Sequence, residues 1–315
     1  MLTDRCVQCI VSFHMPLQNA IIETLAYSDI FDYPLKVDEL RRFLVISASL
    51  HEVEQSAAEM KDISFRDGYY YLAGRDEIVE LRKHREAASQ KTFKRAMFYG
   101  RILGALPFVR MVALTGSLAM LNLSKNPDMD FMLVAKHGRV WTARAFAILL
   151  GKIARLFGDT ICPNLIISER TLDWPLPDLY SAHELCQMIP IAGLDFYLRL
   201  FDANQWIKSF LPNANPKTSE VFATSKVWRA VEFPLQGSLG AKLESWEMSR
   251  KIKKFSAQPG FGEETVFTAD ICQGNFNHHR QWTQDAYQQR LIKIAERGLG
   301  YALFQQSADA NPRSM

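Results

Sequence analysis

A polar turn between two apolar segments constrains the fold of this chain more than any other feature. Residues 108–114 form an apolar run of strand length, and Gly116-Ser117 follows it almost at once. A second apolar segment, residues 128–134, begins with two acids, Asp128 and Asp130. Because alternate side chains of a strand point to opposite faces, these two carboxylates are expected to project together. The pattern predicts two buried strands, the second with a paired-carboxylate face.

The chemistry of these residues indicates a site for a cation and a phosphate. Two adjacent carboxylates repel each other and resist joint ionisation unless a positive charge lies between them. Mg²⁺ or Mn²⁺ suits such oxygen ligands, so Asp128 and Asp130 are the predicted metal ligands. Gly116 and Ser117 form a turn in which backbone N–H groups can approach a phosphate without a Cβ in the way.

Strand, Gly-Ser turn, helix and Asp-x-Asp on the next strand together resemble the motif of the DNA polymerase β-type nucleotidyltransferases. The motif covers Leu114 to Val134. Flanking segments resemble a group of bacterial nucleotidyltransferase-domain proteins with an N-terminal winged helix, and this looser likeness runs from about residue 21 to 213. The segments that carry it are 118–120, 126–127, 161–164 and 180–185.

The resemblance implies an α+β fold with a short mixed sheet in a nucleotidyltransferase core. It implies Mg²⁺-dependent transfer of a nucleoside monophosphate from a nucleoside triphosphate to an acceptor, with release of pyrophosphate. Asp128 and Asp130 would hold the metal, and Gly116 and Ser117 the phosphates. The acceptor stays open among a small molecule, a protein side chain and an RNA end. The competing hypotheses are a catalytically weak nucleotide-sensing regulator and a structural adaptor, and the two aspartates argue against the adaptor.

A third strand, residues 161–168, is where this chain departs from the family. Members of the superfamily often carry a third carboxylate there. Strand alternation predicts Cys162, Asn164, Ile166 and Ser168 on one face, and none of these residues is acidic. Asn164 is the candidate substitute, because its amide supplies a neutral oxygen. This leaves open whether a second metal binds and how the acceptor is activated.

Three helical features have both a functional and a structural interpretation. Arg144, on a helix over residues 139–157, could bind triphosphate oxygens with its planar guanidinium or lie on the surface. The basic helix over residues 76–103 is either a guide for phosphates or a solvated face. His183 and Glu184, on a helix over residues 178–189, could enter the site, although a packed helix is the favoured interpretation.

The N-terminal part is expected to be a winged helix-turn-helix. Helices are predicted over residues 17–27, 37–44 and 49–60, and a hairpin over residues 63–72. Asp67-Gly68 between the strands is a strong hairpin signal. The third helix carries Glu52, Glu54 and Glu59 but no Lys or Arg. Since neutralisation of phosphates dominates DNA affinity, duplex DNA is not an expected partner, and a scaffold or protein-contact role is favoured.

The chain has 315 residues, of which 48% are hydrophobic, with a formal net charge of +3. This length favours two or three domains, and the charge is too small to indicate a nucleic-acid partner. The expected organisation is a winged-helix module (17–75), a connecting basic helix (76–104), a nucleotidyltransferase core (105–173) and a helical C-terminal domain (174–304).

A cytoplasmic protein is expected from the remaining composition. No apolar run reaches the ~18 residues of a membrane span, and the N-terminus lacks the apolar segment of a signal peptide. The five cysteines are an odd number, which is typical of reduced thiols. Cys6, Cys9 and His14 leave a zinc site open, but ordinary thiols are favoured. A metal role for the adjacent His278 and His279 is not expected, because their side chains point in different directions.

Overall fold

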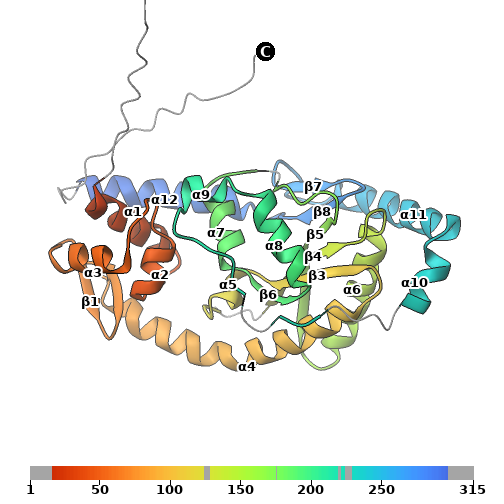
Figure 1. Cartoon of the computed structure of the whole chain (residues 1–315), viewed down its shortest axis with the longest axis horizontal. Coiled ribbons are helices and arrows are strands. Elements are labelled where there is room, and N and C mark those ends of the chain that lie inside the picture. The colour runs from red at the N-terminus through yellow and green to blue at the C-terminus, as the bar shows by residue number, and fades with distance from the viewer. Residues whose placement is uncertain (1–15, 124–127, 175, 219–220, 224–228, 297–315) are drawn as a thin grey trace, which may run out of the picture.

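The structure is a computed structural model, and the fold is mixed α+β, as predicted (Figure 1). The structure describes residues 16–123, 128–174, 176–218, 221–223 and 229–296. Cys6, Cys9 and His14 lie outside the described residues, as does the Asn126-Pro127 segment of the family likeness. None of the helices in the described ranges is long and apolar enough to cross a membrane.

The N-terminal module consists of three helices and an antiparallel hairpin. Its elements are α1 (Leu17–Asp29), α2 (Val37–Arg42), α3 (Leu50–Ala58), β1 (Ile63–Arg66) and β2 (Tyr69–Leu72). Asp67 and Gly68 both adopt positive φ, as a two-residue hairpin turn requires. Ser49 begins α3 with a capping box, because its hydroxyl accepts from the Glu52 N–H while the Glu52 carboxylate accepts from the Ser49 N–H. These elements therefore form where local sequence signals predict them.

Helix α4 (Glu77–Ala105) connects this module to the sheet. Its 29 residues span roughly 44 Å at a rise of 1.5 Å per residue. Several of its basic side chains have partners within the protein: Arg82 with Glu39, Lys83 with Asp67, Arg85 with Asp32, Arg95 with Asp159 and Arg101 with the Phe222 ring. These contacts favour the structural interpretation of the helix over a guide for phosphates.

The second sheet has six strands in the order β6-β3-β4-β5-β8-β7. Its strands are β3 (Val109–Leu114), β4 (Asp128–Ala135), β5 (Thr160–Ser168), β6 (Ile189–Ala192), β7 (Thr265–Phe267) and β8 (Ile271–Gly274). The β4–β5 pair is parallel and the other pairs are antiparallel. The predicted motif strands β3, β4 and β5 are therefore direct neighbours in the sheet.

Three strands come from the part of the chain that was expected to be helical. Strands β6, β7 and β8 have only four, three and four residues, so no periodic pattern marks them in the sequence. Helix α7 ends at Gln187, close to the predicted end at residue 189, and Pro190 lies within β6, where an edge strand tolerates its missing N–H. The prediction of a helical C-terminal domain is corrected accordingly.

Helices cover both faces of the six-stranded sheet. The helices that follow α4 in the chain are α5 (Gly116–Ala119), α6 (Val140–Arg155), α7 (Leu179–Gln187), α8 (Leu194–Ala203), α9 (Ile207–Phe210), α10 (Arg229–Leu235), α11 (Ser238–Phe255) and α12 (His279–Glu296). Residues of α4 and α6, with Phe255 of α11, pack in one hydrophobic cluster with one face of the sheet. The opposite face shares a second cluster with α7, α8, α12 and the N-terminal module.

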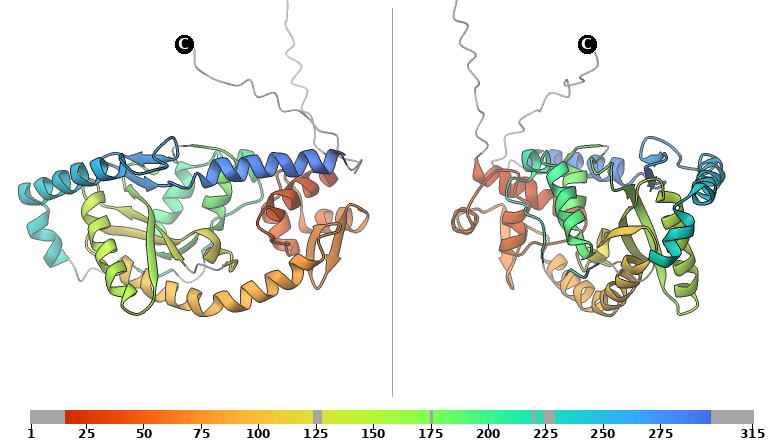
Figure 2. Two further views of the ribbon diagram at one scale, coloured as in Figure 1. Left: turned by 180° about the vertical axis from the view of Figure 1, so that it is seen from behind. Right: turned by 45° about the vertical axis from the view of Figure 1, so that its right-hand side comes forward.

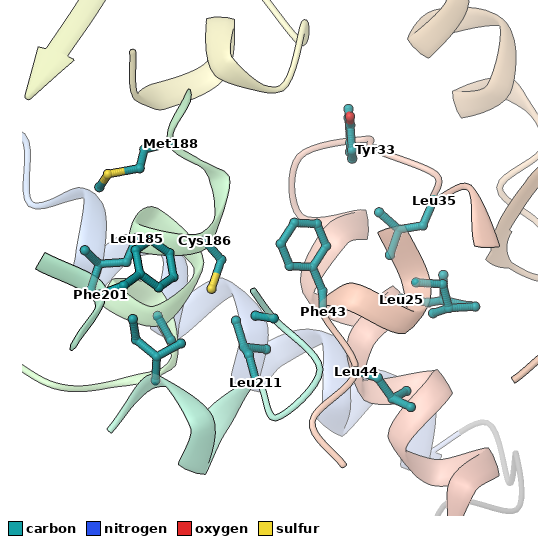
Figure 3. Packing of buried hydrophobic residues seen from close by; sticks show 14 of the residues in the cluster. Leu25, Tyr33, Leu35, Phe43, Leu44, Leu185, Cys186, Met188, Phe201 and Leu211 are labelled. Carbon is teal, nitrogen blue, oxygen red and sulfur yellow. The ribbon is translucent and has the colours of Figure 1, made fainter. Parts of the chain in front are cut away.

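The N-terminal module and the α7–α9 layer therefore share one core. Figure 3 shows Phe43 and Leu44 of the module on one side of this cluster and Leu185, Cys186 and Leu211 on the other. In Figure 2, α4 runs along one side of the molecule and α12 along the opposite side, and each extends from the N-terminal helices to the sheet. The shared hydrophobic core holds the N-terminal module in place beside the sheet.

A buried carboxylate joins the module to α12. Asp29 is 4% exposed. Its Oδ1 lies 2.9 Å from Nε of Arg75, and its Oδ2 lies 2.6 Å from Nε of Arg290 on α12. A buried charge of this kind is stable only while its partners remain in place.

We expect Asp29→Asn to destabilise the folded protein by about 2 kcal/mol, because the substitution removes the carboxylate that pairs with Arg290 and one of the carboxylates that pair with Arg75. Urea denaturation followed by circular dichroism measures the change. The control is Asp202→Asn, which alters an exposed aspartate of α8. Equal stability of the two variants would contradict a joining role for Asp29.

Candidate functional site

A cavity of about 630 Å³ lies between the N-terminal module, the six-stranded sheet and the start of α12. Five of the six predicted site residues line it: Gly116, Ser117, Asp128, Asp130 and Asn164. They come from the turn after β3, the first residues of β4 and the middle of β5. The structure therefore brings these five residues to a single cavity.

Gly116 allows the turn to approach the carboxylate pair. Its φ is +65°, a left-handed backbone conformation that residues other than glycine rarely adopt. A Cβ at this position would lie 2.7 Å from Oδ2 of Asp130. The Thr115 N–H donates to the Asp130 carbonyl at 2.9 Å, which joins the turn to β4. Both the backbone conformation and the lack of space require glycine here.

Asp128 and Asp130 face the cavity, as strand alternation predicted. Met129 and Phe131 between and after them are buried on the opposite face of the sheet. Asp128 is exposed, whereas Asp130 is half-buried. Burial raises the pKa of Asp130 to about 6, and the negative charge of Asp128 contributes to the rise, while a hydrogen bond from Cys162 opposes it. The pair therefore resists joint ionisation below about pH 6.

Asn164 lines the cavity together with Cys162, as strand alternation predicted, and it lies at a bulge in β5. Phe131 pairs with Pro163 and Met132 pairs with Leu165, so Asn164 is an extra residue without a partner on β4. It is exposed and lines the cavity. The bulge also shifts the alternation, so the prediction for the next residues is corrected: Leu165 packs on the cavity side of the sheet and Ile166 on the other.

Cys162, which pairs with Asp130 across the two strands, also lines the cavity. Burial raises the pKa of its thiol to about 12, and the charges of Asp130 and Asp128 contribute. The thiol therefore remains protonated and can donate a hydrogen bond to the Asp130 carboxylate. A protonated thiol is a poor nucleophile, so this position supports the carboxylates and does not indicate thiol chemistry.

Glu184 of α7 brings a third carboxyl group to the cavity. Burial raises its pKa to about 7, and the negative charge of Asp130 adds to the rise. The Asp178 carboxylate accepts a hydrogen bond from the Ser181 N–H at 2.7 Å and so begins the helix. The sequence marked Glu184 as a candidate but favoured a packed helix, because helical periodicity alone did not show which face meets the site.

His183 lines the same cavity as a neutral side chain. Burial lowers its pKa to about 3. Its ring stacks on Tyr27, with centroids 3.9 Å apart, and a tilted Phe43 ring lies 5.0 Å from it. Its Nδ1 is buried and has no hydrogen-bond partner among the described residues. His183 therefore contributes a packed ring with one unsatisfied nitrogen.

Arg144 is the predicted site residue that does not line the cavity. Its guanidinium lies 4.9 Å from the centroid of the Phe255 ring and forms a hydrogen bond with the Cys272 side chain. Helix α6 packs with α11 and the opposite face of the sheet, so this arginine is directed into that packing. The predicted contact with triphosphate oxygens is therefore corrected.

The donor set of the cavity suits a cation that shares its ligands with a bound molecule. Within the described residues, no group of three or more His, Cys, Asp or Glu side chains is arranged to hold a metal ion. The protein offers two adjacent carboxylates, and Mg²⁺ commonly takes one or two carboxylates and completes its shell with phosphate oxygens and water. Asp128 and Asp130 fit such an ion. His279, at the start of α12, also lines the cavity.

We expect Gly116→Ala to cost more stability than Gly138→Ala. Gly138 has a similar φ of +68°, but a Cβ there would meet nothing within 4 Å. The left-handed conformation should cost about 1 kcal/mol in each variant, and the contact with Asp130 should add ~1–3 kcal/mol in Gly116→Ala alone. Urea denaturation of the two variants measures the difference, and equal values would show that Asp130 moves aside freely.

A second prediction concerns pH. Glu184 has a pKa of about 7 in the folded protein against 4.5 for a free glutamate, so the folded state retains a proton that the unfolded state loses. Stability should therefore fall as pH rises from about 4.5 to about 7. In thermal melts at pH 5 and pH 8, Glu184→Gln should become more stable relative to the native protein at the higher pH. Glu59→Gln, at an exposed position on the surface, is the control.

Comparisons with known proteins add no assignment to this geometry. No protein-family model matches the chain. Neither curated proteins nor solved structures provide a match. A functional assignment therefore has to come from the residues around the cavity and from the chemistry that they allow.

Proposed function

We propose that this protein is a metal-dependent nucleotidyltransferase, which moves a nucleoside monophosphate from a nucleoside triphosphate to an acceptor and releases pyrophosphate. The observation that supports the proposal most is that the Gly116 turn, Asp128 and Asp130 meet at one cavity of about 630 Å³. Cavities of roughly 300–1,000 Å³ are typical of small-molecule sites. The order of these elements also agrees with the DNA polymerase β-type superfamily that residues 114–134 resemble.

Asp128 and Asp130 are the residues that would hold Mg²⁺ or Mn²⁺. The bound ion would neutralise negative charge that develops on the phosphate oxygens during transfer. The raised pKa of Asp130 supports this role, since repulsion from Asp128 contributes to it and a cation between the carboxylates would relieve that repulsion. Gly116 and Ser117 would hold the phosphates through the backbone of the turn and the serine hydroxyl.

The transfer step requires one bond to form and one to break. An acceptor oxygen attacks the α-phosphorus, the bond from that phosphorus to the bridging oxygen breaks, and pyrophosphate leaves with the electron pair. The acceptor proton has to move to a base, and removal of a proton by a positioned base typically contributes ~10²–10⁴-fold. Glu184 is the candidate base, because it faces the cavity and its pKa of about 7 allows it to take up a proton near neutral pH.

Asn164 has a narrower role in this proposal. Its amide can accept a hydrogen bond from an acceptor hydroxyl and orient it, but an amide does not take up a proton. The strand β5 therefore lacks the carboxylate that members of the superfamily often carry there. This observation favours the second candidate function, a nucleotide-sensing regulator that binds triphosphate and turns it over weakly. Release of labelled pyrophosphate would distinguish the enzyme from the regulator.

The N-terminal module is proposed to be a winged helix that does not bind duplex DNA. Helix α3 exposes Glu52 and Glu54, Glu59 is exposed directly after it, and carboxylates repel a phosphate backbone. The acceptor in this proposal is a small molecule, a protein side chain or an RNA end, and the protein acts in the cytoplasm. The cavity is bounded on one side by the module itself, so an acceptor would enter beside these helices.

We expect triphosphate binding to require a divalent ion. In calorimetric titrations, Mg²⁺ should strengthen the affinity for a nucleoside triphosphate at least tenfold (~1.4 kcal/mol) relative to buffer with EDTA. Asp128→Asn and Asp130→Asn should each abolish most of this gain without loss of stability, because they remove like-charge repulsion. Asp202→Asn is the matched control. Equal affinities with and without Mg²⁺ in the native protein would overturn the proposed function.

A further inference from the structure

The cavity that holds the carboxylates is also lined by aromatic rings. Phe31 follows α1, Tyr27 lies within α1, and Trp282 lies on α12, and all three line the cavity. The rings of Phe31 and Trp282 have centroids 6.1 Å apart and meet nearly edge to face. Trp282 is 52% exposed and Phe31 is half-buried, so both rings have surface that a ligand can cover. These three residues are called the aromatic wall below.

Hydrogen bonds fix the aromatic wall to the loop that follows the phosphate turn. Asn122 donates from Nδ2 to the Phe31 carbonyl at 3.1 Å, and Arg85 donates to the same carbonyl at 3.1 Å. The Tyr33 hydroxyl donates to the Met120 carbonyl at 3.0 Å. Phe31 is therefore held against the same loop that continues from Gly116 and Ser117.

An unsatisfied nitrogen lies behind the aromatic wall. His183 is 3% exposed, and its Nδ1 has no hydrogen-bond partner among the described residues. A buried polar atom of this kind costs free energy unless a bound molecule or a water satisfies it. His183 stacks on Tyr27 of the aromatic wall, and both residues line the cavity. The ligand indicated here has a flat ring with polar atoms at its edge.

We propose that the aromatic wall binds the nucleobase of the nucleoside triphosphate, with Phe31 and Trp282 as the stacking residues. This inference rests on the proposed function, because the carboxylates and the Gly116 turn then hold the phosphates in the same cavity. The ribose connects base and phosphates, so the base has to lie within this cavity. Stacking on aromatic side chains tolerates any base, since every base has a π-face. The N-terminal module is thereby part of the nucleotide site.

The experiment compares ligands with and without a base. Calorimetric titrations with Mg²⁺ use the four ribonucleoside triphosphates and inorganic tripolyphosphate. The native protein should bind its preferred nucleoside triphosphate at least tenfold more tightly than tripolyphosphate. Phe31→Leu and Trp282→Leu should each weaken the nucleoside triphosphate about tenfold, or about 1.4 kcal/mol, and leave tripolyphosphate unchanged. Phe31→Tyr, which keeps the ring, should retain native affinity.

An exposed tryptophan outside the cavity provides a matched control. Trp246 lies on α11, is 61% exposed and does not line the cavity, so Trp246→Leu should bind both ligands as the native protein does. Trp282 is similarly exposed, which makes Trp282→Leu a variant that is expected to fold even where Phe31→Leu does not. Thermal melts of all variants confirm that affinities are compared between folded proteins.

The outcomes separate this inference from the function on which it rests. If neither tripolyphosphate nor any nucleoside triphosphate binds, the proposed function fails. If both bind with equal affinity, or if the variants retain the preference for the nucleoside triphosphate, the function stands and base stacking on the aromatic wall is wrong. If Trp282→Leu weakens the binding of both ligands equally, base stacking is also wrong. The aromatic wall would then affect binding only by maintaining the structure of the cavity.

Discussion

The electrostatic repulsion among three carboxyl groups governs the candidate site. Asp128 raises the pKa of Asp130, and Asp130 raises that of Glu184, in addition to the effect of burial on both. Protonation relieves this repulsion near neutral pH, and a bound cation would relieve it without protonation. A core that served packing alone would gain nothing from such an arrangement. Perturbed carboxyl groups that converge in a cavity are instead typical of binding and catalytic sites.

The rest of the structure keeps these groups together. The Asp130 carboxylate lies so close to Gly116 that the turn has no room for a Cβ, and the Thr115 N–H holds the same segment to β4. Asp29 at the end of α1 pairs with Arg290 of α12, so an ion pair links the helix that carries Tyr27 to the helix that carries Trp282. The cavity is thus lined by segments that are distant in the sequence.

The elements that the sequence predicted well are those with local signals. The hairpin turn at Asp67-Gly68 and the apolar runs of β3 and β4 each depend on residues close together in the chain. The strands β6, β7 and β8 have no such signal, because they are short and become strands only by pairing with neighbours from elsewhere. The bulge at Asn164 belongs to the same class, since it is defined by the register with β4.

By itself, the sequence determined that a Gly-Ser turn follows one strand and that two carboxylates on the next strand face the same way. Both features depend on neighbouring residues, through turn geometry and the period of a strand. Only the tertiary structure decided which helical side chains join them. Glu184 faces the cavity and Arg144 does not, although both lie on amphipathic helices with ordinary spacing. The reason is that α7 and α6 pack on opposite faces of the sheet, so the inward direction of each helix is set by the layer it covers and not by its own residues.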